Sequence, residues 1–222
     1  MKHIGLFGGT FNPIHLGHVR VIREVKSGFD LDEILIIPTA LPPHKKSEKV
    51  VDAKDRLKMI RLAFLNEPDY VISDVELKRS GPSYTIDTVR YFTSRMPEST
   101  RLYLIMGLDA FLEIDTWKSY KELFLLIPFI VIFRILGAKD DRTSGSESVG
   151  HYLRSRISKG YTFSPSQSTY IHDNKRPVFV FDVSPVDISS TLIREHIKRG
   201  ISIKHLVPEI IEDFIKTKGL YL

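Results

Sequence analysis

Short apolar runs alternate with segments of helical periodicity along most of the chain. The apolar runs predict strands over residues 4–7, 33–38, 101–106, 129–133 and 178–183, and residues 70–77 also have an extended pattern. Apolar positions that recur every three or four residues predict helices over about 15–26, 53–66, 84–96 and 189–199, and after Pro208. The alternation predicts a Rossmann-like, doubly wound α/β fold, in which a mainly parallel sheet of about five or six strands carries helices on both faces.

The pattern predicts a single domain over residues 1–222 with one insertion. Between about residues 137 and 176 the sequence is dominated by Gly, Ser, Asp and Lys, and only residues 152–157 are faintly helical. We expect a surface insertion of mixed order there. Residues 188–222 form a C-terminal helical segment, and the apolar side of its last helix is expected to pack over the sheet.

Composition narrows the class of protein. A chain of 222 residues that is 42% hydrophobic can bury a proper core. It contains no cysteine, which removes disulfides and thiol chemistry and fits a reducing cytosol. No uncharged apolar run reaches the length of a membrane helix, so we expect a soluble, cytoplasmic protein. The net charge of +5 suits phosphate-rich ligands, but it is also typical of lysines that face water.

The most informative stretch is IGLFGGTFNPIHLGH, at residues 4–18. It predicts a strand that is interrupted by Gly8 and Gly9 and followed by a helix that begins near residues 14–16. Such a helix N-terminus is a site for an anion, most simply a phosphate. His15 and His18 are three residues apart, so both imidazoles can donate to phosphate oxygens. A glycine pair after a strand is also common without a ligand, and a zinc fragment is the alternative for the histidines.

Further polar or basic clusters follow other predicted strands. The loop after the second strand contains His44, Lys45 and Lys46, which are either ligand-binding or a solvated basic group. Asp109 follows the strand at 101–106, where it could accept hydrogen bonds from ribose hydroxyls or cap the next helix. Trp117, the only tryptophan, is either a partly buried anchor or a flat face for a heteroaromatic ring.

A last cluster stands at the start of the helix that follows the strand at 178–183. Ser189, Ser190 and Thr191 are either ordinary caps or, with Arg194 one turn later, a polyphosphate cradle. All of these clusters fall at the carboxyl ends of strands, so they share one rim of the sheet. We predict a triphosphate site between the turns near Gly8 and Ser189, beside a second, ring-bearing ligand. It is not a P-loop, because no GxxxxGK[ST] is present.

Two of these segments, GGTFNPIHLGH and ISSTLIR, resemble the paired signatures of the nucleotidyltransferase superfamily of adenylyltransferases. Together with PPHK at 42–45, RSGPSYTIDT at 79–88, GLDAF with TW at 107–117 and LVPEII near the end, the ordered set resembles the bacterial nicotinate-nucleotide adenylyltransferase family. The resemblance covers nearly the whole chain apart from 137–176. This chain departs from the family in having Asn12 where many members have Asp, and in the length of the insertion.

The resemblance implies transfer of AMP from ATP to nicotinate mononucleotide, which gives deamido-NAD and pyrophosphate. It implies Mg²⁺ bound mainly through the ATP phosphates, a possible homo-oligomer, and neither a nucleic acid nor a membrane as a partner. It assigns catalysis to His15, His18 and Arg194. The residues that it places at ATP are Gly8, Gly9, Thr10, Phe11, Gly107, Asp109, Ser189, Ser190 and Thr191. Those that it places at the mononucleotide are Lys45, Ser83, Tyr84, Thr85, Trp117 and Arg134.

Rival interpretations differ in the acceptor or in the class of protein. Enzymes that adenylylate nicotinamide mononucleotide or phosphopantetheine would share both signatures. A non-catalytic nucleotide- or RNA-binding module is the alternative outside the superfamily, and the lack of an RNA-type aromatic platform argues against it.

Overall fold

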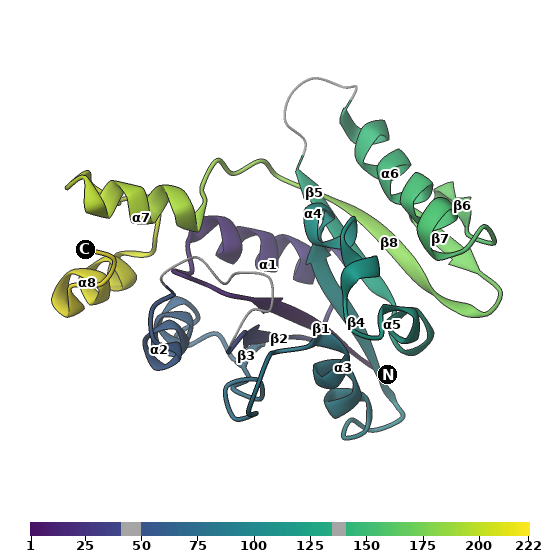
Figure 1. Ribbon diagram of the computed structural model, residues 1–222, viewed down its shortest axis with the longest axis horizontal. Helices are drawn as coiled ribbons and strands as arrows, with labels where there is room; N and C mark the ends of the chain where they lie inside the picture. The colour runs from purple at the N-terminus through teal and green to yellow at the C-terminus, as the bar shows by residue number, and fades with distance from the viewer. Residues whose placement is uncertain (41–49, 135–140) are drawn as a thin grey trace.

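Eight strands of the described residues form one sheet at the centre of the molecule, in the order β3-β2-β1-β4-β5-β8-β7-β6 (Figure 1). The computed structural model describes residues 1–40, 50–134 and 141–222, with the backbone alone for Arg134 and residues 141–144. The strands are β1 (Lys2–Gly9), β2 (Glu33–Pro38), β3 (Tyr70–Ile72), β4 (Thr100–Gly107), β5 (Phe129–Arg134), β6 (Thr162–Ser164), β7 (Thr169–His172) and β8 (Lys175–Val183). In this spatial order, every neighbouring pair from β3 across to β8 is parallel. Next to β8, the strands β7 and β6 form an antiparallel edge. The predicted parallel sheet is confirmed, with more strands than expected.

Helices cover both faces of the sheet, as the doubly wound prediction requires (Figure 1). One face packs against α1 (Leu16–Gly28), α2 (Ala53–Ala63), α7 (Ser190–Lys198) and α8 (Glu209–Lys218). The other packs against α3 (Thr85–Thr93), α4 (Leu108–Phe111), η1 (Ile114–Thr116), α5 (Tyr120–Leu126), α6 (Asp141–Tyr152) and η2 (Leu153–Ile157). A short turn, η3 (Pro165–Gln167), joins β6 to β7.

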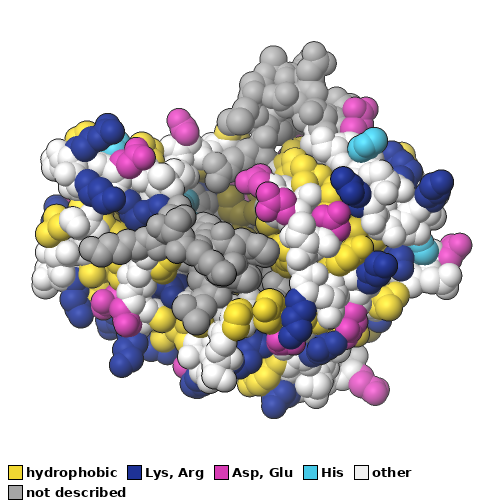
Figure 2. All heavy atoms as spheres, viewed as in Figure 1, with side chains coloured by type: hydrophobic (Ala, Val, Ile, Leu, Met, Phe, Trp, Pro, Cys, Tyr) yellow, Lys and Arg dark blue, Asp and Glu magenta, His cyan; other side chains and the backbone are white. Residues whose placement is uncertain are grey.

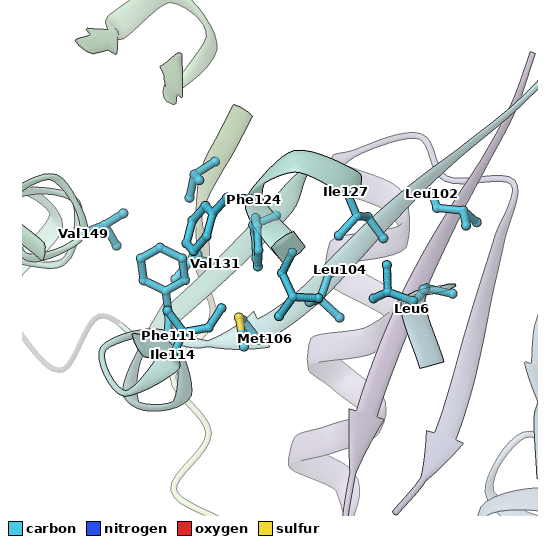
Figure 3. Close-up of a cluster of buried hydrophobic side chains, with 14 of the residues drawn as sticks. Leu6, Leu102, Leu104, Met106, Phe111, Ile114, Phe124, Ile127, Val131 and Val149 are labelled. Atoms are coloured by element: carbon cyan, nitrogen blue, oxygen red, sulfur yellow. The ribbon is translucent and has the colours of Figure 1, made fainter. Parts of the chain in front are cut away.

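The apolar runs of the strands supply a hydrophobic core on each side. Successive side chains of a strand point to opposite faces, so Ile34 and Ile36 of β2 join the core under α1 and α2, whereas Leu35 and Ile37 join the core under α3. Figure 3 shows part of the second core, where Phe111 of α4 and Phe124 of α5 lie over β4 and β5. Burial on both faces explains why these strands lack the polar alternation of a half-exposed sheet.

The order of the strands locates the natural ligand site of the fold. From β1 the chain winds outward through β2 to β3, and it then returns to β4 on the other side of β1. Between β1 and β4 the winding therefore reverses. In open α/β sheets, ligands bind outside the carboxyl ends of the strands at such a reversal.

Several predicted boundaries differ from the structure. Gly8 and Gly9 do not interrupt β1, because both still pair with the end of β2. The extended segment at 70–77 is a strand only as far as Ile72, since β3 is a short edge strand. Asp52 is the N-cap of α2, and its side chain accepts from the Lys54 N–H at 2.7 Å. The N-cap of α3 is Tyr84, and α2 and α3 each end three residues earlier than predicted.

The C-terminal helix also differs in detail from the prediction. Pro208 is its N-cap. Ile211 and Ile215 are buried, and Phe214 packs partly against the same core, whereas Ile210 is 42% exposed. The apolar side is therefore narrower than expected, but the helix does pack over the sheet face that carries α1 and α2.

The insertion has more regular structure than its sequence indicates. Its described part comprises α6, η2 and the strands β6 and β7, which extend the sheet beyond β8. Tyr170 is buried, and its hydroxyl donates to the Ser146 carbonyl at 2.8 Å, across a close approach at Gly150. Tyr152 ties α6 to η1, because its hydroxyl donates to the Asp115 carboxylate at 2.7 Å. Because α6 is rich in Ser and Gly, it has no apolar stripe, and hydrophobic periodicity does not predict it.

Three buried tyrosines predict a loss of stability in alkali. Burial, with the Asp115 hydrogen bond, raises the pKa of Tyr152 to about 12, and burial raises the pKa of Tyr161 and Tyr221 as well. The unfolded chain then releases these protons at a lower pH than the folded chain. The contribution of these tyrosines to the free energy of unfolding is therefore fully present below about pH 10 and decreases above it. We expect the urea midpoint at pH 11 to lie below that at pH 9, with tyrosinate absorbance rising at unfolding. Equal midpoints would contradict this.

Among the helices in the described parts of the chain, none combines the length and the apolar character that a membrane crossing needs.

Candidate active site

A cleft of about 1350 Å³ opens at the carboxyl ends of β1 and β4, where the winding reverses. Its floor is apolar and includes Leu6, Leu104 and Met106. Its walls come from the β1–α1 loop, the start of α3, the β4–α4 turn, residues 116–118 and Ser189. Figure 2 shows a hollow with hydrophobic side chains at its bottom, between the α7 side and the α4 side of the molecule. An apolar cleft with a few polar groups on its rim is the usual form of a small-molecule site.

The two histidines stand together at the start of α1. His15 is the N-cap in extended backbone, and its Nδ1 accepts from the His18 N–H at 3.3 Å, so α1 begins one residue later than His15. A neutral His15 therefore carries its proton on Nε2. The His15 and His18 rings lie with their centroids 3.7 Å apart, and both line the cleft. The predicted pairing of these imidazoles at one wall is what the structure contains.

Two glycines in this turn are explained by close packing of rings. A Cβ on Gly17 would lie 3.0 Å from Nδ1 of His15, and a Cβ on Gly9 would lie 2.9 Å from the Phe11 ring. Phe11 is buried and meets the His18 ring edge-on, with centroids 5.2 Å apart. Phe11 thus supports His18, and its side chain is not among those that line the cleft, so its predicted place at ATP stays a prediction.

The second motif meets the first through hydrogen bonds to the carbonyls of the β1–α1 loop. Arg194 Nη1 donates to the Asn12 carbonyl at 2.9 Å, and Ser190 Oγ donates to the Pro13 carbonyl at 2.8 Å. Arg194 and Asn12 are 182 residues apart in the sequence. Arg194 Nη2 also donates to Thr191 Oγ1 at 3.2 Å. Of this cluster only Ser189 lines the cleft, while its Oγ caps α7.

Asn12, the departure from the family pattern, has a local contact. Its Oδ1 accepts from the Val51 N–H at 3.2 Å, and the residue is buried. A carboxylate oxygen could accept the same bond, so this contact tolerates either residue.

The opposite wall brings together the predicted acceptor residues. Tyr84 and Thr85 begin α3, which has no side-chain cap, and both line the cleft. Trp117 packs partly against the core and also lines the cleft. One ring is therefore both partly buried, as in the first interpretation, and open to a ligand, as the second requires. Lys118, which sequence reasoning did not single out, lines the same wall and lies over the Tyr84 ring at 4.5 Å. Ser83 is buried, and its Oγ accepts from the Ala40 N–H at 3.0 Å.

The β4–α4 turn forms a third wall. Gly107 and Asp109 line the cleft there. The expectation that Asp109 caps the helix is wrong, because α4 already begins at Leu108 with Gly107 as its N-cap. A Cβ on Gly107 would meet nothing within 4 Å. The ribose interpretation of Asp109 stays a prediction.

Gly8 and Thr10 line the cleft beside the histidines, and their contact with ATP stays a prediction. Lys45, with its neighbours His44 and Lys46, lies outside the described residues, and so does the side chain of Arg134.

Sequence reasoning also missed two buried charged residues near the cleft. Arg56 of α2 is 1% exposed, and its guanidinium donates to the carbonyls of Thr10 at 2.7 Å, Val51 at 3.0 Å and Ala40 at 3.5 Å. Desolvation lowers the pKa of this guanidinium, which nevertheless stays charged. Glu76 lies under the start of α3, where its Oε1 accepts from Thr88 Oγ1 at 2.7 Å. The sequence places Arg56 in the predicted helix at 53–66 and Glu76 in the extended segment at 70–77, and neither position has a spacing that marks a buried charge.

The zinc alternative for the histidine pair finds no support in the donor set. Among the described residues, no three His, Asp or Glu side chains stand close enough together to hold a metal ion.

Taken together, the winding reversal, the histidine-capped helix start and the apolar cleft define a nucleotide-binding protein of Rossmann-like fold. A family model described as cytidylyltransferase-like matches residues 6–196. Over 221 residues and 99% of both chains, the protein is 41% identical to a probable nicotinate-nucleotide adenylyltransferase of Desulfatibacillum aliphaticivorans. It is 36% identical to one of Citrifermentans bemidjiense, over 99% of this chain and 98% of the relative.

A solved structure shares the fold over the whole chain. It is a Plasmodium falciparum nicotinic acid mononucleotide adenylyltransferase complexed with NaAD, with a TM-score of 0.73 at 19% identity, over 100% of this chain and 98% of that one. The chain therefore belongs to the cytidylyltransferase-like family, and the two relatives described above are both named as probable nicotinate-nucleotide adenylyltransferases.

Proposed function

We propose that the chain transfers AMP from ATP to nicotinate mononucleotide, forming deamido-NAD and releasing pyrophosphate. The observation that carries this proposal is the meeting of the two motif segments at one cleft, through the bonds of Arg194 and Ser190 to the β1–α1 loop. The names of the full-length relatives and the NaAD complex of the structural neighbour support the same reaction.

In this reaction the main role of the protein is to position the two substrates. A phosphate oxygen of the mononucleotide attacks the α-phosphorus of ATP, a new P–O bond forms, and the bond to the bridging oxygen of the pyrophosphate breaks. The attacking group is already an anion, so no general base is needed. What remains is to hold two anionic groups in line and to stabilise the charge that develops on the α-phosphate and the leaving group.

The ATP half of the site is assigned to the β1–α1 and α7 turns. In this proposal His18 and the Nε2–H of His15 donate to the phosphates, beside the N–H groups at the end of β1, from Gly8 to Thr10. Arg194 and Ser190 fix the carbonyl side of the loop, and Thr191 accepts from Arg194. The assignment of these three residues to the departing pyrophosphate stays a prediction, because in this structure only Ser189 of the cluster lines the cleft. Gly107 leaves room for the adenosine, and the carboxylate of Asp109 accepts hydrogen bonds from the ribose hydroxyls.

The acceptor half is assigned to the opposite wall. The uncapped N–H groups at Tyr84 and Thr85 receive the nicotinate carboxylate, because free donors at a helix start favour an anion. Trp117 stacks on the pyridine ring. Ser83 holds this wall in place, and the predicted contributions of Lys45 and Arg134 remain part of the proposal.

Mg²⁺ fits a site of this composition only if it binds together with ATP, through the phosphate oxygens. The described residues offer Asp109 as the exposed carboxylate of the cleft and no cluster of three ligands, so phosphate oxygens would supply most of the coordination. When bound, the ion neutralises charge on the triphosphate.

An acceptor comparison tests the proposal. Pyrophosphate release is measured with ATP and each of nicotinate mononucleotide, nicotinamide mononucleotide and phosphopantetheine. We expect the highest kcat/KM with nicotinate mononucleotide, because only this acceptor brings a ring carboxylate to the α3 amides. A higher kcat/KM with either other acceptor would replace the substrate assignment, and no release with any of them would favour a binding module.

A further inference from the structure

Arg56 reaches the candidate active site from behind. It belongs to α2, outside the cleft, and it is among the largest fully buried side chains of the described residues. Among those residues it makes no ion pair within 4 Å, and its described partners are three carbonyl groups. A buried charge without a carboxylate partner is costly to stability, and apolar residues fill such places more cheaply. The position therefore calls for an explanation beyond packing.

The three carbonyls belong to separate parts of the site. Thr10 is in the β1–α1 turn and lines the cleft on the proposed ATP side. Ala40 follows β2 and Val51 precedes α2. The planar fork of one guanidinium can hold three acceptors at fixed angles, which the single ammonium of a lysine cannot reproduce.

Ala40 extends the connection to the acceptor wall. While its carbonyl accepts from Arg56, its N–H donates to Ser83 Oγ at 3.0 Å. Ser83 directly precedes Tyr84, the N-cap of α3. A continuous series of contacts thus runs from the Thr10 carbonyl through Arg56, Ala40 and Ser83 to the helix start that is assigned to the acceptor.

We propose that Arg56 is a positioning residue that sets the register between the ATP-binding turn and the acceptor-binding helix start. It touches neither substrate. In an in-line transfer, a shift of the attacking oxygen by a fraction of an ångström relative to the α-phosphorus slows the chemical step, while each substrate keeps its own binding contacts. Loss of the Arg56 contacts therefore lowers kcat more than it raises either KM. This inference rests on the proposed function for its kinetic part only.

The test compares the same substitution at two positions of one helix. Arg61 also lies on α2 but is exposed. We expect Arg56→Lys to lower kcat about tenfold, with both KM values within about threefold of the parent, and Arg61→Lys to leave all three constants unchanged. A parent-like kcat in Arg56→Lys, or a rise in KM at constant kcat, overturns the inference.

Ser83 gives a second variant that keeps the test decisive if Arg56→Lys does not fold. Ser83→Ala removes the acceptor of the Ala40 N–H and should lower kcat about threefold on its own. Where Arg56→Lys does fold, the double variant should be no slower than Arg56→Lys alone, because both residues act through one series of contacts. Multiplying effects, or an unchanged kcat in Ser83→Ala, count against the inference.

Hydrogen exchange separates this inference from the proposed function. Loss of the Arg56 contacts should speed exchange at the Ala40 amide in Arg56→Lys and not in Arg61→Lys, whatever reaction the protein catalyses. If the parent shows no pyrophosphate release but the exchange changes as expected, the proposed function fails and the connection stands. If the parent is active and exchange at Ala40 is unaltered, the connection fails.

Discussion

The His18→Ala variant is expected to turn over about a hundredfold more slowly than the parent chain, which corresponds to about 3 kcal/mol of lost transition-state stabilisation. The His18 imidazole lines the cleft at the first turn of α1, held between the His15 ring and the edge of Phe11. In the proposed complex this imidazole donates to the phosphate whose charge increases in the transition state, and donors that are positioned before the reaction contribute strongly to such transfers. Steady-state pyrophosphate release at saturating ATP and nicotinate mononucleotide measures kcat.

Two further variants make this result specific. His18→Gln keeps an N–H donor at about the same reach, and it should recover part of the lost rate. His151→Ala is the matched control, because His151 is an exposed residue of α6 far along the chain from the cleft motifs, and its kcat should equal that of the parent. A parent-like kcat in His18→Ala would remove His18 from the proposed chemistry and leave His15 as the remaining imidazole donor.

The parallel part of the sheet was predictable because each of its strands is buried on both faces. Runs such as residues 34–37 can satisfy that requirement only as central strands of a covered sheet. The insertion was not predictable in the same way. Its strands are held by contacts distant in sequence, such as Tyr170 with Ser146, and its helix carries no apolar stripe, so local periodicity contains no signal.

The residues that face the cleft were predictable where a motif combines several requirements. His15 and His18 stand at a strand-to-helix turn that also needs Gly17 for the close packing of the His15 ring, and such a combination is visible in sequence. Residues that act on the backbone from behind were not predictable. Arg56 is one basic residue among several on an amphipathic helix, and only the fold reveals that the carbonyls of Thr10 and Ala40 surround it.

Trp117 carries the second large prediction. It is the only tryptophan, and one ring both packs against the core and lines the acceptor wall of the cleft. Stacking of an aromatic side chain on a base-like ring contributes about 1 to 3 kcal/mol. We therefore expect Trp117→Leu to raise the KM for nicotinate mononucleotide about thirtyfold, with the KM for ATP unchanged. Initial rates over a matrix of both substrates separate the two constants.

The identity of the replacement decides between stacking and mere packing. Trp117→Phe keeps a flat face and should stay within about fivefold of the parent KM, whereas leucine fills the core side of the site but offers no ring. Because no other tryptophan emits, the parent's fluorescence should also change when nicotinate mononucleotide is added, and not to the same extent with ATP alone. If Trp117→Phe and Trp117→Leu raise the mononucleotide KM equally, the ring acts as a core anchor, and the pyridine must be held by the α3 side of the cleft.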